Sequence, residues 1–442
     1  MIVLQAGIWY AQRYAALAMD LSKKARPPRR VELERIAAIC ERVPAHPARS
    51  FYEAVQSALF LHILMHLESR AQESPGRMDQ YLYPYYKRDL KEGRLTQEEA
   101  IELLECLRVK MSTLRLFNGV AYNEIISGEA QYHNVTLGGQ TPEGEDATNE
   151  LSYLFLEAAF RTRTPHPTLS IRYHDKISKD FVLKGLELVK VGLSFPAFFN
   201  DHSAIPWLLA SGVPLETARG YCIGGCVHHL IPGQSSPLEP FFISIPKCLE
   251  LALHNGVDPR TGKQLGPRTG AFEDFKTFED FLGGFKTQVH YFSVQGGKIT
   301  NEQRVGRADI APTMLSSAFV DDCIPLGKSC LGGGARYPLL AQISVGMIDA
   351  VDSLSAIKKC IFEEKAIRKA ELLEALAVNF AGKEGWRKVL EKAPKYGNDD
   401  DAVDTLAAEL YDWWRKMVGA IDAPYENGVR LNYLTIDISF GF

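Results

Sequence analysis

The stretch GVPLETARGYCIGGCVHHLIPGQSS, residues 212–236, is the part of the sequence richest in chemically active side chains. Two cysteines, Cys222 and Cys226, are followed by the pair His228–His229. Glycines before the histidines and a proline–glycine pair after them predict an irregular loop rather than a helix. Gly224–Gly225 allow a close backbone approach and a positive φ immediately before the second cysteine. This loop is therefore the first place to look for a functional site.

The residues of this loop alone leave three interpretations open. The first is a buried structural cysteine in a tight turn. The second is a zinc site using Cys222, Cys226 and both histidines, although structural zinc motifs use two separated ligand pairs and so short a segment rarely surrounds one ion. The third is a Cys–His nucleophile for acyl transfer, which needs an imidazole within hydrogen-bonding reach of the thiol. Close neighbours in sequence usually point apart, which weakens the third interpretation.

The composition is that of an ordinary globular protein, with 442 residues, 46% of them hydrophobic and 24% charged. Its 50 basic and 54 acidic residues are nearly balanced, which gives no electrostatic footprint for nucleic acid. Apolar runs such as residues 58–65 are far shorter than the roughly 20 residues of a membrane span. The N-terminus lacks a basic region and a small-residue cleavage site, so we expect no signal peptide. Eight cysteines without a C-x-x-C pair favour a reducing, cytoplasmic compartment.

Hydrophobic periodicity predicts helices first and alternating strands and helices later. The predicted N-terminal helices cover residues 9–23, 30–42, 50–68 and 97–111, with Thr96 as the cap of the last one. From residue 132 onward, strands at 132–137, 167–173 and 197–200 alternate with helices at 146–161 and 181–191. This alternation predicts an α/β fold. The last third is predicted to be helical and to end in a strand at residues 435–442, and no linker separates domains.

Many motifs of the chain together resemble the glycyl radical enzymes, the pyruvate formate-lyase-like superfamily. The segments that carry the resemblance include VPAHPARSFYEAVQSALFLH (43–62), SPGRMDQYLYPYYKRDLKEGRLTQEEA (74–100), HPTLSIRYH (166–174), ARGYCIGGCV (218–227), GGGARY (332–337) and APKYGNDDD (393–401). The resemblance implies part of a ten-stranded α/β barrel with a central cysteine finger loop at residues 218–236. It also implies one domain over residues 1–442, mainly helical in 1–125, with barrel strands in 126–350 and helices in 351–442.

The resemblance assigns the chemistry to the cysteine loop. Cys226 is expected to carry a thiyl radical that abstracts hydrogen from the substrate. Eliminating members of the family usually have a glutamate base where this chain has His228, so His228 or His229 is expected to handle the proton. Diol dehydratases have a second carboxylate further along the loop, for which Glu239 is the only candidate. Classical diol dehydration is therefore disfavoured, and pyruvate formate-lyase chemistry is disfavoured because the two cysteines are not adjacent.

Other polar residues are expected near the substrate or in the framework. Arg70 and Glu73 precede the SPGRMDQ motif at a place where family members often contact substrate, and the alternative is a solvated helix end. Asn200 and His202 end a predicted strand and are expected either to face the barrel or to be structural. The motif residues Arg77, Asp79 and Gln80 are expected to pin a turn through charge-assisted hydrogen bonds. His62 and His66 are interpreted as packed helix histidines, and no metal site is expected.

The resemblance also concerns partners. The family's C-terminal glycyl radical segment is not found in the sequence, and the near match Arg304–Arg307 is interpreted as coincidence. We therefore expect no bound cofactor, and an organic glycyl radical on a missing segment or separate subunit. A radical S-adenosylmethionine activating enzyme would install it. The expected function is a lyase that cleaves a C–C or C–heteroatom bond of a small-molecule substrate. The alternatives are radical addition of the succinate-synthase type, a truncated non-catalytic paralogue acting as a binding subunit, and a zinc-dependent hydrolase. A homodimer is a further expectation.

Overall fold

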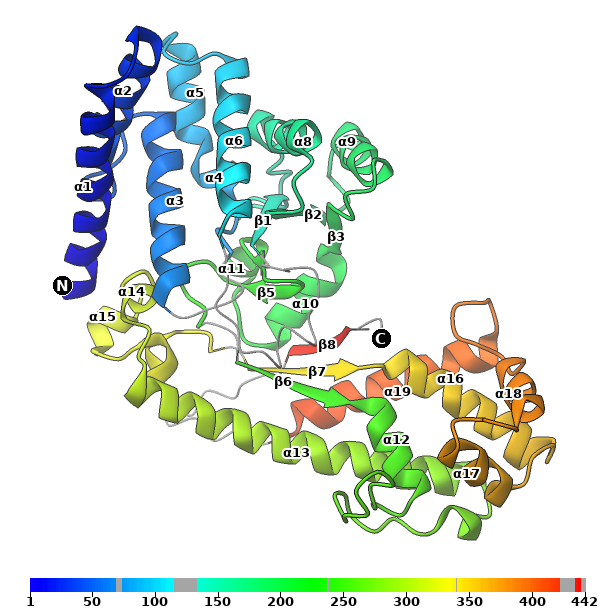
Figure 1. The fold of residues 1–442 in the computed structure, drawn as a ribbon. Helices are drawn as coiled ribbons and strands as arrows, with labels where there is room; N and C mark the ends of the chain where they lie inside the picture. Colours follow the sequence, from blue (N-terminus) through cyan, green and yellow to red (C-terminus); the bar gives the residue numbers. More distant parts are fainter. Residues whose placement is uncertain (69–73, 115–132, 237–238, 339, 422–433, 439–442) are drawn as a thin grey trace. The chain divides into compact units, whose positions relative to one another are not determined.

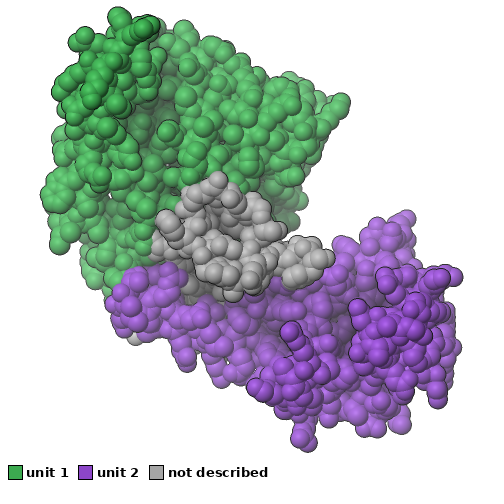
Figure 2. Space-filling model, in the orientation of Figure 1, with its two compact units in different colours: residues 1–236, 312–330, 334–337 green, residues 237–311, 331–333, 338–442 purple. Residues whose placement is uncertain are grey.

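The computed structural model describes residues 1–68, 74–114, 133–236, 239–338, 340–421 and 434–438 (Figure 1). The chain divides into two compact units, drawn in green and purple in Figure 2. Unit 1 comprises residues 1–236, 312–330 and 334–337, and unit 2 comprises residues 237–311, 331–333 and 338–442. The expectation of one domain over residues 1–442 stays a prediction.

Unit 1 begins with a layer of helices. They are α1 (Ile2–Ser22), α2 (Pro27–Arg42), α3 (Phe51–Glu68), α4 (Met78–Tyr81), α5 (Tyr83–Lys91) and α6 (Gln97–Ser112). The predicted cap of the last helix is confirmed: Thr96 Oγ1 accepts a hydrogen bond from the backbone N–H of Glu99 at 3.2 Å, and the Glu99 carboxylate accepts the N–H of Thr96 at 2.7 Å. This reciprocal pair fixes the start of α6.

A parallel sheet follows the helical layer. Its strands β1 (Asn134–Gly138), β2 (Thr168–Tyr173) and β3 (Ala197–Asn200) lie in that order. The connections are α8 (Glu150–Thr162) and α9 (Lys179–Lys190), which makes two successive βαβ units. Apolar side chains of the sheet and helices share one buried cluster that includes Leu137, Phe155, Ile171 and Phe181. The α/β alternation predicted from the sequence is thus confirmed.

The rest of unit 1 contains the cysteine loop. After α10 (Asp201–Ala210) and α11 (Leu215–Arg219), the short strands β4 (Cys222–Gly224) and β5 (His228–Leu230) pair antiparallel. The segment expected to be irregular is therefore a small hairpin. Two short helices, α14 (Met314–Ala318) and α15 (Cys323–Leu326), complete the unit.

Unit 2 contains a second parallel sheet surrounded by helices. Its strands are β6 (Glu239–Ser244), β7 (Leu340–Val345) and β8 (Leu434–Ile438), in that order. The helices are α12 (Ile245–Leu253), α13 (Phe278–Ile310), α16 (Met347–Ile357), α17 (Lys369–Ala377), α18 (Glu384–Glu391) and α19 (Asp401–Gly419). Two short helical segments of this unit lie at 272–274 and 358–363, and a third, at 330–334, is divided between the two units. Phe281, Phe285, Leu354 and Trp414 belong to the buried core of this unit.

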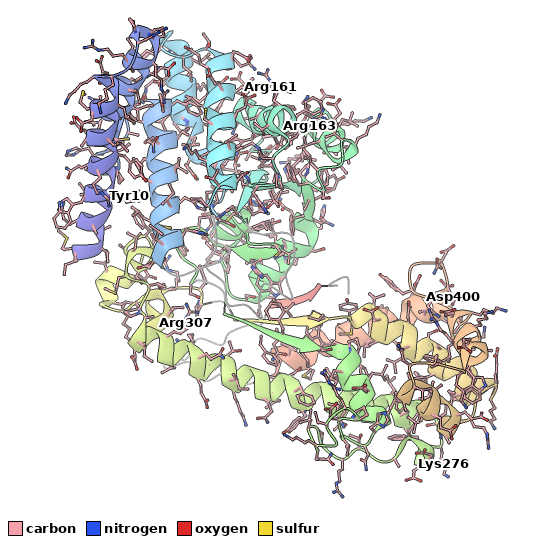
Figure 3. All side chains as sticks on the ribbon, viewed as in Figure 1. Tyr10, Arg161, Arg163, Lys276, Arg307 and Asp400 are labelled. Carbon is pink, nitrogen blue, oxygen red and sulfur yellow. The ribbon has the colours of Figure 1, made fainter. Side chains whose placement is uncertain are left out.

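The long helix α13 contains the sequence that nearly matches a glycyl radical loop. The near match to a glycyl radical loop, Arg304–Arg307, lies inside this helix, and Arg307 marks its position in Figure 3. A regular helix is not the loop that the motif implies, in agreement with the expectation of coincidence. None of the helices in the described segments combines the length and apolar character needed to cross a membrane.

Candidate active site

The hairpin of unit 1 places Cys226 at its tip. Gly224 pairs with His228 as the last rung of the β4–β5 ladder, so residues 225–227 form the connection. Gly225 has a φ of +55°, a conformation that costs glycine little and that most other residues avoid. Gly224 is also required, because a Cβ atom there would lie 2.3 Å from Cδ1 of Leu230. The two glycines predicted to shape the loop therefore do so, and they leave Cys226 half-buried.

Hydrogen bonds tie this hairpin to the first sheet. Ser74 Oγ accepts the backbone N–H of Gly225 at 2.9 Å and that of Asn134, the first residue of β1, at 3.1 Å. Thr136 Oγ1, also in β1, accepts the N–H of Ile223 at 2.8 Å. Two side-chain oxygens thus fix both the strand and the tip of the hairpin relative to β1. Sequence reasoning missed Ser74 and Thr136 because their partners are distant in the chain.

Cys222 has a different environment from Cys226. Its side chain is buried and lies against Gly76, where an added Cβ atom would be 3.6 Å from Cys222 Sγ. Burial raises the pKa of the Cys222 thiol to about 11, although Arg77 and Arg172 act in the opposite direction. At neutral pH this group is a protonated thiol packed in the interior.

The two histidines point to opposite faces of the hairpin. Successive residues of a strand alternate in direction, and His228 and His229 are neighbours within β5. His228 is only 4% exposed, and burial lowers its pKa to about 4, with His229 as a smaller cause. His229 lies among the rings of Phe199, Trp207 and Tyr221, at centroid distances of 6.0, 6.0 and 5.1 Å. Burial, and then Arg172, lower the pKa of His229 to about 4, so both imidazoles are neutral at pH 7.

A buried ion pair lies behind His229. Arg172 of β2 donates from Nε and Nη2 to the two carboxylate oxygens of Asp201, at 3.0 and 2.7 Å. Its guanidinium also donates to the carbonyl of Tyr221 at 2.9 Å and lies 3.8 Å from the centroid of the Tyr221 ring. The Tyr221 hydroxyl donates to Asp201 at 2.7 Å. This bidentate pair holds the start of β4 against β2 and β3, and nothing in the local sequence signalled it.

The predicted framework residues of the SPGRMDQ motif do make structural hydrogen bonds, but these bonds hold the turn after β1 and the bond from Gln80 is not charge-assisted. Arg77 donates to the carbonyls of Gly138 and Gln140 at 2.8 and 3.2 Å. The buried carboxylate of Asp79 accepts the N–H of Gly138 at 2.7 Å. Gln80 donates to the carbonyl of Ala147 at 2.9 Å, so the motif holds the turn that follows β1.

The residues predicted to contact substrate, other than the histidines of the hairpin, lie in several separate elements. Asn200 caps α10 by accepting the N–H of His202 at 3.0 Å, and His202 is exposed and paired with Asp175 at 3.0 Å. Glu239 begins β6, in unit 2, and its side chain is not among those described. Arg70 and Glu73 lie outside the described residues. A substrate role for these five residues stays a prediction.

Histidines of unit 1 also meet near α3. His62 Nε2 and His133 Nδ1 are 2.9 Å apart, and the rings of His66 and His133 have centroids 5.3 Å apart. Burial, and then the other two rings, lower the pKa of His62 to about 3. Sequence analysis missed the third ring because His133 is far away in the chain. No group of three or more histidine, cysteine or acidic side chains in the described part of the chain is arranged to hold a metal ion.

The fold matches solved enzymes of one class. The chain is 34% identical to a glycyl radical enzyme from Archaeoglobus fulgidus, with a TM-score of 0.89 over 98% of this chain and 55% of that one. It is 37% identical to the glycerol-bound B12-independent glycerol dehydratase from Clostridium butyricum, with a TM-score of 0.91 over 97% of this chain and 54% of that one. The fold is therefore that of the glycyl radical enzyme barrels, as predicted. Enzymes of this class use an organic glycyl radical.

Sequence comparison gives the family. A model of the pyruvate formate lyase-like family matches residues 1–442. An isethionate sulfite-lyase of Nitratidesulfovibrio vulgaris is 38% identical over 422 residues, which is 92% of this chain and 50% of that enzyme. The chain belongs to the pyruvate formate lyase-like family. It spans about half the length of the curated relatives it matches.

Proposed function

We propose that this chain provides the cysteine half of a glycyl radical-type lyase acting on a small polar molecule. The observation that carries the proposal is the position of Cys226, half-buried at the tip of a glycine-shaped hairpin that Ser74 anchors to β1. Enzymes similar to this chain are named as lyases and dehydratases of small polar compounds. Their names support the class of reaction and not a particular substrate.

In the proposed reaction Cys226 exchanges one hydrogen atom with the substrate. The Cys226 thiyl takes a hydrogen atom from a substrate C–H bond, so an S–H bond forms and the unpaired electron moves to carbon. The base takes a proton from a hydroxyl or amine on the radical carbon while the bond from the adjacent carbon to the leaving group breaks, and the leaving group departs with both bonding electrons. The product radical takes the hydrogen atom back from Cys226, which restores the thiyl. An active site that excludes water protects the thiyl and the substrate radicals from side reactions.

His228 is the proposed proton acceptor. It occupies the position where the resembling eliminases have a glutamate. Burial lowers its pKa to about 4, so the ring is neutral at pH 7 and has a lone pair for a proton, and it is a weaker base than an ordinary histidine. His229 is less suited, because it points to the opposite face and is enclosed by aromatic rings. A neutral imidazole cannot hold two substrate hydroxyls as a carboxylate can, so substrates other than a vicinal diol are favoured.

The initial radical must come from another segment or chain. We propose that a glycyl radical segment, either outside the residues of this sequence or on a separate subunit, and activated by a radical S-adenosylmethionine enzyme, completes the active site in the cytoplasm. The relatives are about twice as long as the part of them that this chain matches. Radical addition instead of cleavage is an outcome that the following experiment distinguishes, and a non-catalytic binding subunit stays an alternative. A homodimer stays a separate expectation, which size-exclusion chromatography with light scattering would test.

The test is anaerobic reconstitution. The chain is mixed with a separately produced glycyl-radical segment from a full-length relative and with that relative's activating enzyme. Electron paramagnetic resonance measures the glycyl radical, and product analysis measures cleavage of isethionate and hydroxyproline, with the vicinal diol 3-sulfopropanediol as the disfavoured comparison. The proposal predicts a radical signal, cleavage products and loss of turnover in Cys226→Ser. A radical signal with normal turnover in Cys226→Ser contradicts the assignment of Cys226. Adducts in place of fragments favour addition, and a radical signal without product means that the tested compounds are not substrates of the reconstituted complex.

A further inference from the structure

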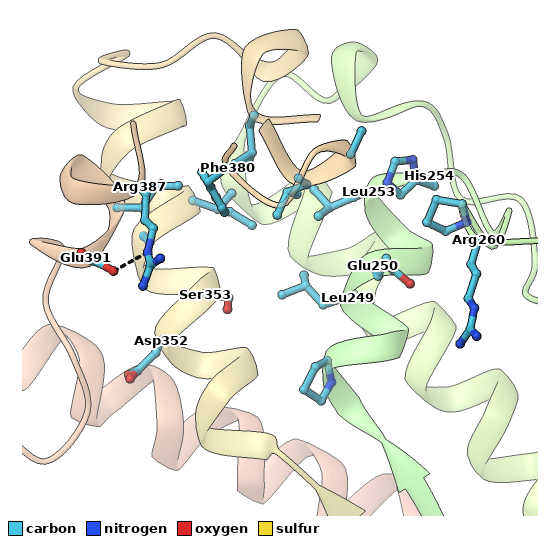
Figure 4. A pocket seen from close by; sticks show the side chains of 18 of the residues that line it. Leu249, Glu250, Leu253, His254, Arg260, Asp352, Ser353, Phe380, Arg387 and Glu391 are labelled. Carbon is cyan, nitrogen blue, oxygen red and sulfur yellow. Dashed lines mark hydrogen bonds and ion pairs between the residues drawn. The ribbon is translucent and has the colours of Figure 1, made fainter. Parts of the chain in front are cut away.

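Unit 2 contains a pocket of about 720 Å³ among α12, α16, α17 and α18 (Figure 4). Leucines of α12, α17 and α18 line its interior. Its charged lining contains as many carboxylates as cations, namely Glu250, Asp352, Glu391, Arg260, Arg387 and Lys395. Because these charges balance, the pocket selects no class of ligand. A surface of unit 1 is more informative about its partner.

That surface begins at β3, the open edge of the first sheet. At the other edge, all five residues of β1 are buried, and Gly76 forms a bridge with Val135. In β3, by contrast, Ala197, Phe198 and Asn200 are exposed. No described strand pairs with the side of β3 that faces away from β2. An open edge strand presents backbone N–H and C=O groups to which another strand can bond.

Helix α9, which packs on this sheet, has two apolar stripes. The first is buried and consists of Phe181, Gly185 and Leu188, at the i, i+4, i+7 spacing of one helix face. The second repeats this spacing one residue further on and consists of Val182, Leu186 and Val189. Leu186 is 46% exposed and Val189 is 40% exposed. The second stripe therefore leaves apolar surface in contact with water.

The second stripe lies on the side of α9 that faces away from α8. Lys184 pairs with Glu157 of α8 at 3.3 Å, and Leu186, two residues later, lies about 200° further around the helix. An added Cβ atom at Gly185 would be 3.4 Å from Cζ of Phe198, so the exposed ring of β3 lies beside α9. In Figure 1, α9 ends the row formed by α6, α8 and α9. The stripe and the open strand thus form one surface, the β3–α9 surface.

The β3–α9 surface fits a strand that comes with its own helix. A strand alone would bond to β3 and leave the second stripe in water. A helix alone would cover the stripe and leave the backbone groups of β3 open. A strand beside β3 with a helix beside α9 satisfies both, and it continues the βαβ pattern of the described sheet.

The open edge also lies close to the cysteine hairpin. The Phe199 side chain points to the sheet face opposite that of Phe198, and its ring centroid lies 6.0 Å from that of His229. A strand added beside β3 lies about 4.8 Å further along the sheet, and alternate side chains of it point to the face that carries the hairpin. A segment that exchanges a hydrogen atom with Cys226 must reach this face.

We infer that the glycyl radical segment docks on the β3–α9 surface, with a strand along β3 and a helix against Val182, Leu186 and Val189. The identity of this segment rests on the proposed function. The relatives contain sequence that can supply it, because they are about twice as long as the part of them that this chain matches. The docking itself involves no radical chemistry and is measured without it.

Hydrogen–deuterium exchange of the full chain, with and without the glycyl-radical segment of a relative and without activating enzyme, tests the inference. We expect the segment to slow exchange at residues 197–200 and in α9 and to leave α2 unchanged. Leu186→Asp places a carboxylate in the second stripe, and Val189→Asp is a second variant of the same kind. Leu17→Asp is the matched control, because Leu17 of α1 is 52% exposed. Circular dichroism establishes that the variants are folded.

The inference predicts that Leu186→Asp and Val189→Asp each weaken binding of the segment about tenfold or more, and that Leu17→Asp leaves it unchanged. Binding without protection of β3 and α9, equal affinity of all variants, or no binding would overturn the inference. Protection of this surface that rises with the concentration of the chain alone would assign it to a second copy instead. Turnover without this protection would overturn the docking alone, and protection without turnover would count only against the proposed reaction.

Discussion

The hydroxyl oxygen of Ser74 lies 2.9 Å from the backbone nitrogen of Gly225 and accepts its hydrogen bond, one residue before Cys226. The same oxygen accepts the N–H of Asn134 at the start of β1. A single side chain thus connects the segment before α4, the first strand of the sheet and the tip of the cysteine hairpin. We infer that the position of the Cys226 backbone relative to β1 depends on this serine.

Replacing Ser74 by alanine should destabilise unit 1. Two backbone N–H groups lose their acceptor, and one unsatisfied buried donor costs about 1–3 kcal/mol. We expect Ser74→Ala to lower the free energy of unfolding in urea by about 2 kcal/mol or more. Ser203→Ala, at an exposed position of α10, should change it by less than about 0.5 kcal/mol. Equal effects of the two changes would show that the Ser74 contacts are dispensable.

Removing one partner of the buried Arg172–Asp201 pair should lower the free energy of unfolding more than Ser74→Ala does. Arg172→Met leaves the Asp201 carboxylate in the interior with donors only from Tyr221 and Gln140. An uncompensated buried charge costs about 3–5 kcal/mol, so we expect a loss of that size in urea unfolding. The double variant Arg172→Met/Asp201→Leu should recover part of it. The account would be contradicted if the double variant were destabilised, relative to the unaltered chain, by the sum of the losses in Arg172→Met and Asp201→Leu.

Stability should fall as the pH is lowered from about 7 to about 4. An unfolded histidine titrates near pH 6.5, whereas burial lowers the pKa of His229 to about 4 in the folded chain. Below about pH 6.5 the unfolded chain therefore binds more protons, and the free energy of unfolding decreases on acidification. At about pH 4, protonation of His229 in the unfolded chain has lowered the free energy of unfolding by an amount on the order of 3 kcal/mol.

Phenylalanine can replace the His229 ring among its aromatic neighbours without a group that titrates. His229→Phe should therefore show a shallower decrease in stability between pH 7 and pH 4 than the unaltered chain, measured by urea unfolding at several pH values. His46→Phe, at an exposed position, is the control and should leave the slope unchanged. An identical slope in all three proteins would show that His229 is not protonated more readily in the unfolded state.

Alkylation should distinguish the two cysteines of the hairpin. Cys226 is half-buried, whereas Cys222 is buried with a pKa raised to about 11, and thiolate is the reactive form. Brief treatment of the folded chain with iodoacetamide should modify the exposed Cys106 first and Cys226 next, and should spare Cys222. Peptide mass spectrometry measures the order. Modification of Cys222 before Cys226 would mean that the hairpin is oriented differently.

Local signals in the sequence predicted much of the fold. Thr96 begins α6 as expected, and the alternation after residue 132 gives β1, α8, β2, α9 and β3. These elements follow from caps and periodicity, which involve neighbouring residues. The hairpin was predicted as an irregular loop because three-residue strands rich in glycine and histidine have no β pattern of their own. The β4–β5 hairpin is held by contacts with distant residues, such as the hydrogen bond from the backbone N–H of Ile223 to Thr136 Oγ1.

The framework of the site depended on contacts between distant segments. Ser74, Thr136 and the Arg172–Asp201 pair each connect positions separated by many residues, and no local pattern marks them. For the same reason, the contact of His133 with His62 and His66 was not predicted, because His133 is far from both in the sequence. The cysteine itself was predicted from its glycines and from the family resemblance. Its role stays a proposal that only chemistry can decide.

The most direct test of the central claim compares the two hairpin cysteines in the reconstituted, radical-bearing complex. Turnover of a small polar substrate is measured for the unaltered chain, Cys226→Ser and Cys222→Ser, each checked for an equal glycyl radical signal and an equal far-ultraviolet spectrum. The account predicts that Cys226→Ser forms no product while Cys222→Ser retains turnover. Loss of product in Cys222→Ser together with normal turnover in Cys226→Ser would contradict it.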